Sequence, residues 1–285
     1  MADKIMTIEV AREAGACYGV ERALKMAHEA ARDTAGPVHT LGPLIHNPIV
    51  VSDLEAEGVT VVEDPAVGPG STLLLRTHGV TPAVEAAAQD SGATVLDATC
   101  PFVKKVHRAI ERLAKDGYQV IIVGEAGHPE VEGTLGHAPQ ALVIGSAEEL
   151  RDVDVARRVG VVVQTTMAKA VLDEVVVALM EWAEEVRVLN TICSATSERQ
   201  GAAAELAARA DVMVVIGGRS SANTTHLAQI CAERCSATHH IERTDELDER
   251  WFEGANLVGV TAGASTPRTQ IDEVVEALRA IAGSR

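Results

Sequence analysis

The sequence predicts an α/β protein made of three similar units with mostly parallel sheets. Two observations lead to this fold class. Apolar, β-branched runs alternate with helical segments along the chain, which is typical of parallel strands joined by helices. Cys17, Cys100 and Cys193 each follow such a run and each open an amphipathic helix. Their separations of 83 residues (17 to 100) and 93 residues (100 to 193) match a small α/β unit repeated three times.

The elements follow one another regularly. Pro101 suits the first position of a helix, and residues 102–114 carry apolar residues at helical spacing. The cysteine spacing divides the chain into units 1–100, 101–192 and 193–285, the last ending in a helix. The expected strands lie within residues 4–10, 38–45, 71–79, 94–99, 118–124, 141–146, 158–166, 186–192, 211–218 and 256–263.

Composition and charge exclude several classes of protein. A formal net charge of -16 opposes binding to nucleic acid or to an anionic membrane. No apolar run is long enough to span a bilayer, and residues 1–10 begin with strand-like alternation, so the expectation is a soluble, cytoplasmic protein. Five cysteines, an odd number without a secretion signal, indicate reduced thiols and not a disulfide framework.

The three junction cysteines suggest a shared metal site. A single cysteine is more often small buried filler, but three units around a pseudo-threefold axis would bring three thiolates to one point. Zinc and an iron–sulfur cluster are both possible ligands. Close C-x-x-C pairs, which zinc sites favour, are absent, and three cysteines would leave one iron of a four-iron cluster open as a Lewis acid. Cys231 and Cys235, four apart on an expected helix, are interpreted as buried side chains and not as a metal pair.

Polar residues gather where the expected strands end. Each could simply cap the next helix. Several uncharged donors at successive strand ends nevertheless indicate a pocket for an anion such as diphosphate, built without a cluster of Lys or Arg. These residues are His46, Asn47, His78, His128, Thr165, Thr166, Ser221, Asn223 and Ser265.

Glu130 is the candidate proton donor. A carboxylic acid with a hydroxyl partner such as Thr165 could deliver a proton to a departing oxygen, although Glu130 could instead cap the turn after Pro129. The surrounding HPEVEG lacks the H-E-x-x-H pattern of zinc proteases. Neither a phosphate-binding loop nor a dinucleotide loop is present, so the electrons of a reductase would come from another protein.

These motifs together resemble the 4-hydroxy-3-methylbut-2-enyl diphosphate reductase (LytB) family. The resemblance extends over essentially the whole chain, and its motifs occur in the family's order. They read GACYGVERA, TLGPLIHNP, RTHGV, DATCPFVKKVH, GHPEVEGTLG, QTT, NTICSAT followed by ERQ, GG followed by SSANT, and VTAGASTP.

The resemblance implies a trefoil of α/β units around a central 4Fe-4S cluster with one open iron. It implies reductive removal of the substrate hydroxyl to give isopentenyl and dimethylallyl diphosphate, with electrons from a donor such as ferredoxin or flavodoxin. The implied cluster ligands are Cys17, Cys100 and Cys193. The implied catalytic residues are Glu130, Thr165 and His128, and the implied diphosphate ligands are His46, His78, His128, Ser221, Asn223 and Ser265.

Two positions depart from the family's commonest pattern, and other functions stay open. Ala16 stands where an aromatic residue often precedes the first cysteine, and Ala222 stands where Ser or Gly is usual. The alternatives are a paralogue acting on another allylic substrate, a non-catalytic iron–sulfur redox sensor, and a structural zinc protein. For the electron donor, the expected docking patch is Lys104, Lys105 and Arg108, with a solvated helix face as the competing interpretation.

Overall fold

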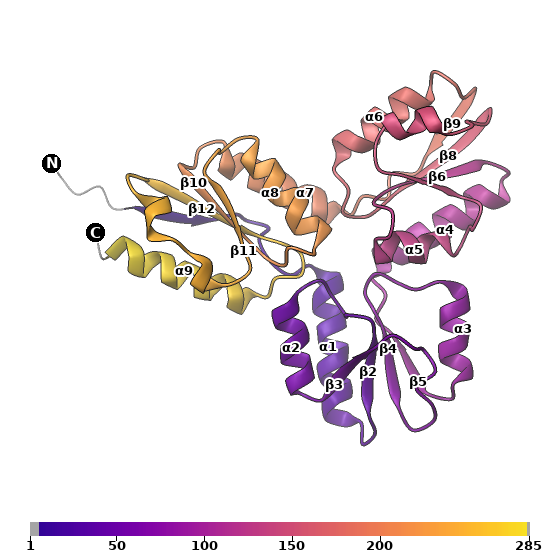
Figure 1. Ribbon diagram of the computed structural model, residues 1–285, viewed down its shortest axis with the longest axis horizontal. Coiled ribbons are helices and arrows are strands. Elements are labelled where there is room, and N and C mark those ends of the chain that lie inside the picture. Colours follow the sequence, from indigo (N-terminus) through magenta and orange to yellow (C-terminus); the bar gives the residue numbers. More distant parts are fainter. Residues whose placement is uncertain (1–5, 284–285) are drawn as a thin grey trace. The chain divides into compact units, whose positions relative to one another are not determined.

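A computed structural model describes residues 6–283, and within them the strands form three four-stranded sheets (Figure 1). Every strand pairing is parallel. The α/β fold class with three similar units is therefore confirmed. Residues 1–5 and 284–285 lie outside the described residues, including the start of the strand expected over residues 4–10. No helix within residues 6–283 is both long and apolar enough to cross a membrane.

The first sheet along the chain has the strand order β3-β2-β4-β5. Its strands are β2 (Val38–Leu41), β3 (Val59–Val62), β4 (Thr72–Leu75) and β5 (Thr94–Asp97). Helices α1 (Tyr18–Asp33) and α2 (Pro48–Ala56) lie on one side of this sheet and α3 (Pro82–Asp90) on the other (Figure 1). The edge strand β3 was not expected from the sequence.

The second sheet has the order β7-β6-β8-β9. Its strands are β6 (Gln119–Val123), β7 (Leu142–Ile144), β8 (Arg158–Val163) and β9 (Glu185–Val188). Its helices are α4 (Pro101–Lys115), α5 (Pro129–Leu135) and α6 (Lys169–Leu179), with a short 3-10 helix at Glu148–Asp152. Buried residues of α4 and α5 pack on one face, and those of α6 pack on the other.

The third sheet has the order β1-β12-β10-β11. Its strands are β1 (Thr7–Val10), β10 (Val212–Ile216), β11 (Thr238–Ile241) and β12 (Leu257–Ala262). Its helices are α7 (Ser194–Ala207), α8 (Ala222–Ala232) and α9 (Arg268–Gly283), with short 3-10 helices at Thr244–Glu246 and Glu249–Phe252. The edge strand β11 was likewise not expected.

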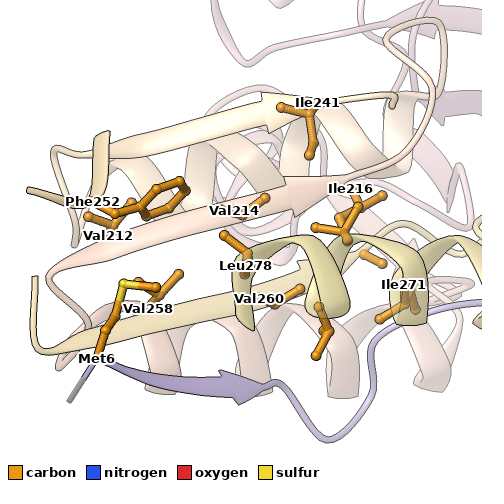
Figure 2. Packing of buried hydrophobic residues seen from close by; sticks show 13 residues of the cluster. Met6, Val212, Val214, Ile216, Ile241, Phe252, Val258, Val260, Ile271 and Leu278 are labelled. Carbon is orange, nitrogen blue, oxygen red and sulfur yellow. The ribbon is translucent and has the colours of Figure 1, made fainter. Parts of the chain in front are cut away.

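The alternation of side chains along β10 shows how each sheet is covered on both faces. Val214 points to a core closed by Ile271 and Leu278 of α9 (Figure 2). Met213, one residue earlier, packs on the opposite face against Leu206 of α7. Because both faces are covered by helices, the central strand is apolar throughout and leaves the polar residues to the loops at its end.

The boundary expected for the first unit, 1–100, differs from the structure. Strand β1 pairs with β12 from Thr7↔Leu257 to Val10↔Val260, so the N-terminal strand completes the third sheet. The reason is that β12 has an open edge, which a parallel strand from the far end of the chain can fill. By contact density the chain divides into two compact units. One holds the described residues up to Cys17, residues 46–48 and the described residues from Ser194 onward, and the other holds residues 18–45 and 49–193.

The close packing of α4 on β8 yields a stability prediction. A Cβ added at Gly160 would lie 2.9 Å from Leu113 Cδ2 and 3.1 Å from Tyr118 Cβ. Gly160→Ala should therefore lower the free energy of unfolding by about 1 kcal/mol or more through overpacking. Gly201→Ala on α7, where a Cβ meets nothing within 4 Å, should raise it by up to about 1 kcal/mol through helix propensity. Chemical denaturation measures both, and effects of the same sign would contradict the close approach.

Candidate functional site

The three junction cysteines occupy equivalent positions in the three sheets. Each follows an edge strand: Cys17 follows β1, Cys100 follows β5 and Cys193 follows β9. The backbone N–H of each donates to a carbonyl two residues beyond the end of the neighbouring strand. The acceptors are Ala264 O at 3.1 Å, Thr77 O at 3.0 Å and Thr165 O at 3.0 Å, respectively. The three units predicted from the cysteine spacing therefore share the same backbone hydrogen bond at each cysteine.

Each cysteine also directly precedes a long helix. Cys17 precedes α1, Cys100 precedes α4 and Cys193 precedes α7, and all three side chains are half-buried. A helix N-terminus favours nearby negative charge, which is what a thiolate ligand carries. Half-buried sulfurs at fixed strand ends fit the ligands of an iron–sulfur cluster. Within residues 6–283 no three His, Cys, Asp or Glu side chains are grouped as ligands of one metal ion.

The carboxyl group of Glu130 is buried and bound by Thr165. Its two oxygens accept from the Thr165 N–H at 2.6 Å and from the Thr165 hydroxyl at 2.7 Å. Glu130 is 3% exposed. Burial raises the pKa of Glu130 above its ordinary value, while the two hydrogen bonds from Thr165 act in the opposite direction. Glu130 therefore holds its proton more tightly than an ordinary carboxyl group, which is the direction that a proton donor requires.

Thr165 connects this carboxyl group to a cysteine. Thr165 lies two residues beyond β8, and its carbonyl is the acceptor for the Cys193 N–H. Its neighbour Gln164, 1% exposed, donates to the Thr166 hydroxyl at 3.0 Å and accepts from the Glu125 N–H at 2.9 Å. The sequence assigned Gln164 no role, although a polar residue directly after a buried strand was the available signal.

His128, not Glu130, caps the helix after Pro129. Its Nδ1 accepts from the Glu130 N–H at 3.1 Å. In the neutral ring the hydrogen is then on Nε2, which makes this nitrogen the donor of the imidazole. The capping alternative for Glu130 is therefore wrong. The His128 imidazole accepts from the Glu130 N–H, and the Glu130 carboxyl group binds Thr165 instead.

His78 lies close to His128. The two rings are edge to face with centroids 5.7 Å apart. The backbones also approach closely here, because a Cβ at Gly133 of α5 would lie 3.3 Å from the carbonyl carbon of Gly79. The structure thus brings together two expected diphosphate ligands on loops that follow β4 and β6.

The remaining expected ligands lie in the other compact unit. The Asn47 amide donates to Ser265 O at 2.9 Å and to Gln270 Oε1 at 3.1 Å. The Ser265 hydroxyl donates to His46 O at 3.2 Å. A Cβ at Gly218 would lie 2.7 Å from the same carbonyl oxygen, so glycine allows the loop before α8 to reach this segment.

Two polar residues at the start of α8 behave differently. The Ser221 hydroxyl caps the helix by accepting from the Thr224 N–H at 3.4 Å. Asn223 is 5% exposed, and neither its amide nitrogen nor its amide oxygen has a hydrogen-bond partner among the described residues. Leaving a buried polar group without a hydrogen bond costs about 1–3 kcal/mol of folding free energy. A ligand that bonds to the Asn223 amide would remove this cost.

Cys231 and Cys235 are separate from these groups. Both are buried in the core between α7, α8 and the third sheet. Burial raises the pKa of Cys231 to about 12, and the neighbouring Cys235 adds to the effect. A thiol of this kind stays protonated, which agrees with the structural interpretation made from the sequence.

The buried acid yields a prediction on stability and pH. Because the pKa of Glu130 is higher in the folded chain than its ordinary 4.5, its stabilising contribution is fully present below that value and is lost as pH rises through the folded-state pKa. In Glu130→Gln the amide oxygen can accept from the Thr165 N–H and the amide NH2 can donate to the Thr165 hydroxyl oxygen, and the side chain has no proton to lose. Its stability relative to the unaltered chain should therefore rise as pH increases from 4.5 through the folded-state pKa of Glu130. Urea unfolding across this range measures the difference, with Glu55→Gln on the exposed side of α2 as control. A pH-independent difference for Glu130→Gln would contradict the raised pKa.

Comparison with known proteins gives a consistent result over almost the whole chain. The family model described as "LytB protein" matches residues 8–279. The chain is 49% identical over 276 residues to the 4-hydroxy-3-methylbut-2-enyl diphosphate reductase of Geobacter sulfurreducens, covering 96% of this chain and 97% of that protein. The reductase of the same name from Aquifex aeolicus is 43% identical over 281 residues, with 97% of each chain covered.

Two solved structures share the fold. One, titled as the (E)-4-hydroxy-3-methyl-but-2-enyl diphosphate reductase, "the Terminal Enzyme of the Non-Mevalonate Pathway", has a TM-score of 0.74 at 42% identity and covers 96% of this chain and 100% of its own. The E-1-hydroxy-2-methyl-but-2-enyl-4-diphosphate reductase of Plasmodium falciparum has a TM-score of 0.91 at 28% identity, covering 96% and 88%. With the family model, the relatives and the repeated cysteine geometry in agreement, the chain belongs to the LytB family.

Proposed function

We propose that the chain reduces 4-hydroxy-3-methylbut-2-enyl diphosphate to isopentenyl and dimethylallyl diphosphate. Two electrons and two protons are consumed, the allylic C–O bond breaks, and the hydroxyl oxygen leaves as water. The observation that carries this proposal is the buried Glu130–Thr165 pair, whose threonine also holds the backbone of Cys193. Thr165 is thus the single residue that contacts both the proposed proton donor, Glu130, and the backbone of Cys193. The names of the relatives supply the substrate.

Cys17, Cys100 and Cys193 are the proposed ligands of a 4Fe-4S cluster. The support is their equivalent placement at three strand ends, each at a helix N-terminus. When bound, such a cluster supplies electrons and, at an iron without a cysteine, a Lewis acid for the substrate hydroxyl. Single cysteines at three separate junctions favour this cofactor over structural zinc, which draws on closely spaced ligands.

Glu130 holds the proton that leaves with the hydroxyl oxygen. Burial raises the pKa of the carboxyl group, and Thr165 fixes the orientation of both carboxyl oxygens. Proton transfer from a positioned acid contributes about 10²–10⁴ in rate. His128 is the proposed second donor, through Nε2, because its Nδ1 accepts from the Glu130 N–H.

The diphosphate is bound by uncharged donors, which are spread over strand-end loops and the start of α8. The orphaned amide of Asn223 is the strongest support, because a buried group with unused hydrogen-bonding capacity gains most from a ligand. It also favours an enzyme over a redox sensor, which needs no anion pocket. A paralogue with another allylic substrate would use the same groups. The proposed ligands are His46, His78, His128, Ser221, Asn223 and Ser265.

The two departures from the family pattern have limited local effects. Ala222 is the first residue of α8 and is buried, so no hydroxyl is available at that position, while the neighbouring Ser221 still caps the helix. Ala16 directly precedes Cys17 and is half-buried, which leaves a smaller side chain beside the proposed ligand.

The proposed function is tested with protein purified without oxygen. Near four irons and four sulfides per chain, and conversion of hydroxymethylbutenyl diphosphate to the two five-carbon diphosphates with dithionite and a viologen, are expected. Glu130→Gln should lower kcat by about 10²–10⁴-fold while the iron content and KM change little. Glu132→Gln, on the exposed side of the same helix, is the matched control. A loaded cluster without product would overturn the substrate assignment, and zinc in place of iron would overturn the mechanism.

The proposed electron donor is an acidic protein of the ferredoxin or flavodoxin class, docking on α4 near Cys100. Lys104 is ion-paired with Asp97, and the Lys105 ammonium lies 4.6 Å from the centroid of the Phe102 ring. The exposed Lys105 and Arg108 are therefore the stronger candidates within the expected patch.

Charge reversal on α4 tests this docking surface. Lys105→Glu and Arg108→Glu should each raise the KM for a reduced ferredoxin by about fivefold or more at low salt, because like charges oppose encounter. Turnover with dithionite and viologen should stay unchanged. Lys115→Glu, at the far end of the same 15-residue helix, should affect neither assay. Equal donor kinetics for all three variants would rule out the patch.

A further inference from the structure

Two arginines bind the backbone of the segments that lead into cysteines. Arg199 of α7 donates to Gly15 O at 2.8 Å, two residues before Cys17. Arg22 of α1 donates to Asp97 O at 3.1 Å and to Thr99 O at 3.4 Å, directly before Cys100. The same type of contact therefore occurs in both compact units, each time within one unit.

Arg199 is the more deeply placed of the two. It is 4% exposed, and its second terminal nitrogen donates to Ala195 O at 3.2 Å. Burying a guanidinium group is costly, so its retention beside one particular carbonyl calls for a reason beyond packing. Arginine keeps its positive charge in such a setting, because it does not lose its proton in proteins.

The segment held by Arg199 has little freedom. Gly15 has a φ of +107°, and a Cβ there would lie 2.9 Å from Ile271 Cδ1. Its N–H donates to Ala262 O at 3.4 Å, and the Cys17 N–H donates to Ala264 O. With the carbonyl of Gly15 bound by Arg199, backbone groups on both sides of the residue before Cys17 are fixed.

Arg22 acts on the corresponding segment before Cys100. Its two contacts bracket Ala98, and the Thr99 N–H is held by the Asp97 carboxylate at 2.9 Å. The two arginines occupy similar positions: Arg22 is five residues after Cys17, and Arg199 is six residues after Cys193. The helix that follows one cysteine thus carries the side chain that binds the segment before another.

We propose that Arg199 and Arg22 are positioning residues for the cluster ligands Cys17 and Cys100, and that their charges raise the reduction potential of the cluster. The inference rests on the proposed function, since it concerns the same cofactor. Holding the cysteine segments slows loss of iron, because a ligand with a fixed backbone rebinds in the correct geometry. One-electron reduction adds negative charge to the cluster, and a fixed positive charge nearby stabilises the reduced form.

Conservative and neutral variants separate the two effects. Arg199→Gln and Arg22→Gln remove the charge and the fork of donors, whereas Arg199→Lys and Arg22→Lys keep the charge and lose the fork. Arg12→Gln is the matched control. Arg12 lies in the same segment as Gly15 but makes an ion pair with Glu205 between side chains 78% and 68% exposed.

The measurements are made on the loaded protein without substrate. The Gln variants should lose iron to a chelator at least fivefold faster than the unaltered protein. Their reduced form should be disfavoured tenfold, a shift of about 59 mV to lower potential for one electron in a redox titration followed by electron paramagnetic resonance. The Lys variants should keep the potential and lose iron faster, and Arg12→Gln should match the unaltered protein in both.

Each outcome bears on the inference. Potentials and iron loss that are unchanged in both Gln variants would overturn it while leaving the proposed function intact. A lowered potential in the Lys variants equal to that in the Gln variants would overturn the charge effect. If Arg199→Gln does not fold, Arg22→Gln tests the effect of charge on the potential, and Arg199→Lys tests the effect of the lost donors on iron loss. Failure of the unaltered protein to take up a cluster would overturn the proposed function and this inference together.

Discussion

The backbone hydrogen bond of each junction cysteine is the constraint on which the candidate site depends. The N–H of Cys17, Cys100 and Cys193 binds a carbonyl just beyond the neighbouring strand, so each side chain leaves its sheet at the same point. In each of the three sheets, a cysteine therefore lies between the end of an edge strand and the N-terminus of a helix. A helix start supplies partial positive charge, and the strand end supplies a fixed position.

The same strand-end segments carry other residues of the proposed site. His78 follows the acceptor of the Cys100 N–H, Ser265 follows that of Cys17, and Thr165 is itself the acceptor for Cys193. Each of these proposed ligand-binding or proton-donating residues is therefore at, or next to, the residue whose carbonyl accepts a cysteine N–H. Substitution of these loop residues is expected to disturb neighbouring groups together, which makes isosteric changes such as Glu130→Gln the informative ones.

Charge in this protein is distributed in a way that suits its proposed chemistry. The net charge is -16, yet the segments before Cys17 and Cys100 are bound by the guanidinium groups of Arg199 and Arg22. The one carboxylic acid at the second sheet's strand ends that is fully enclosed, Glu130, has a raised pKa. Protons and positive charge are thus kept where negative charge would develop, in surroundings where water screens them least.

Features that local pattern controls were predictable from the residues alone. Parallel strands buried on both faces are continuous apolar runs, so β6, β8 and β10 were evident, and each cysteine was placed correctly between a strand and a helix. Features that depend on distant partners emerged only in the folded chain. The edge strands β3 and β11 are short and only partly buried, so their periodicity is weak, and β1 joins β12 because an open sheet edge was available. The capping role of His128 also became evident only from the structure. The contacts of Arg199 and Gln164 were not predictable, because their partners lie far along the chain and local spacing does not identify them.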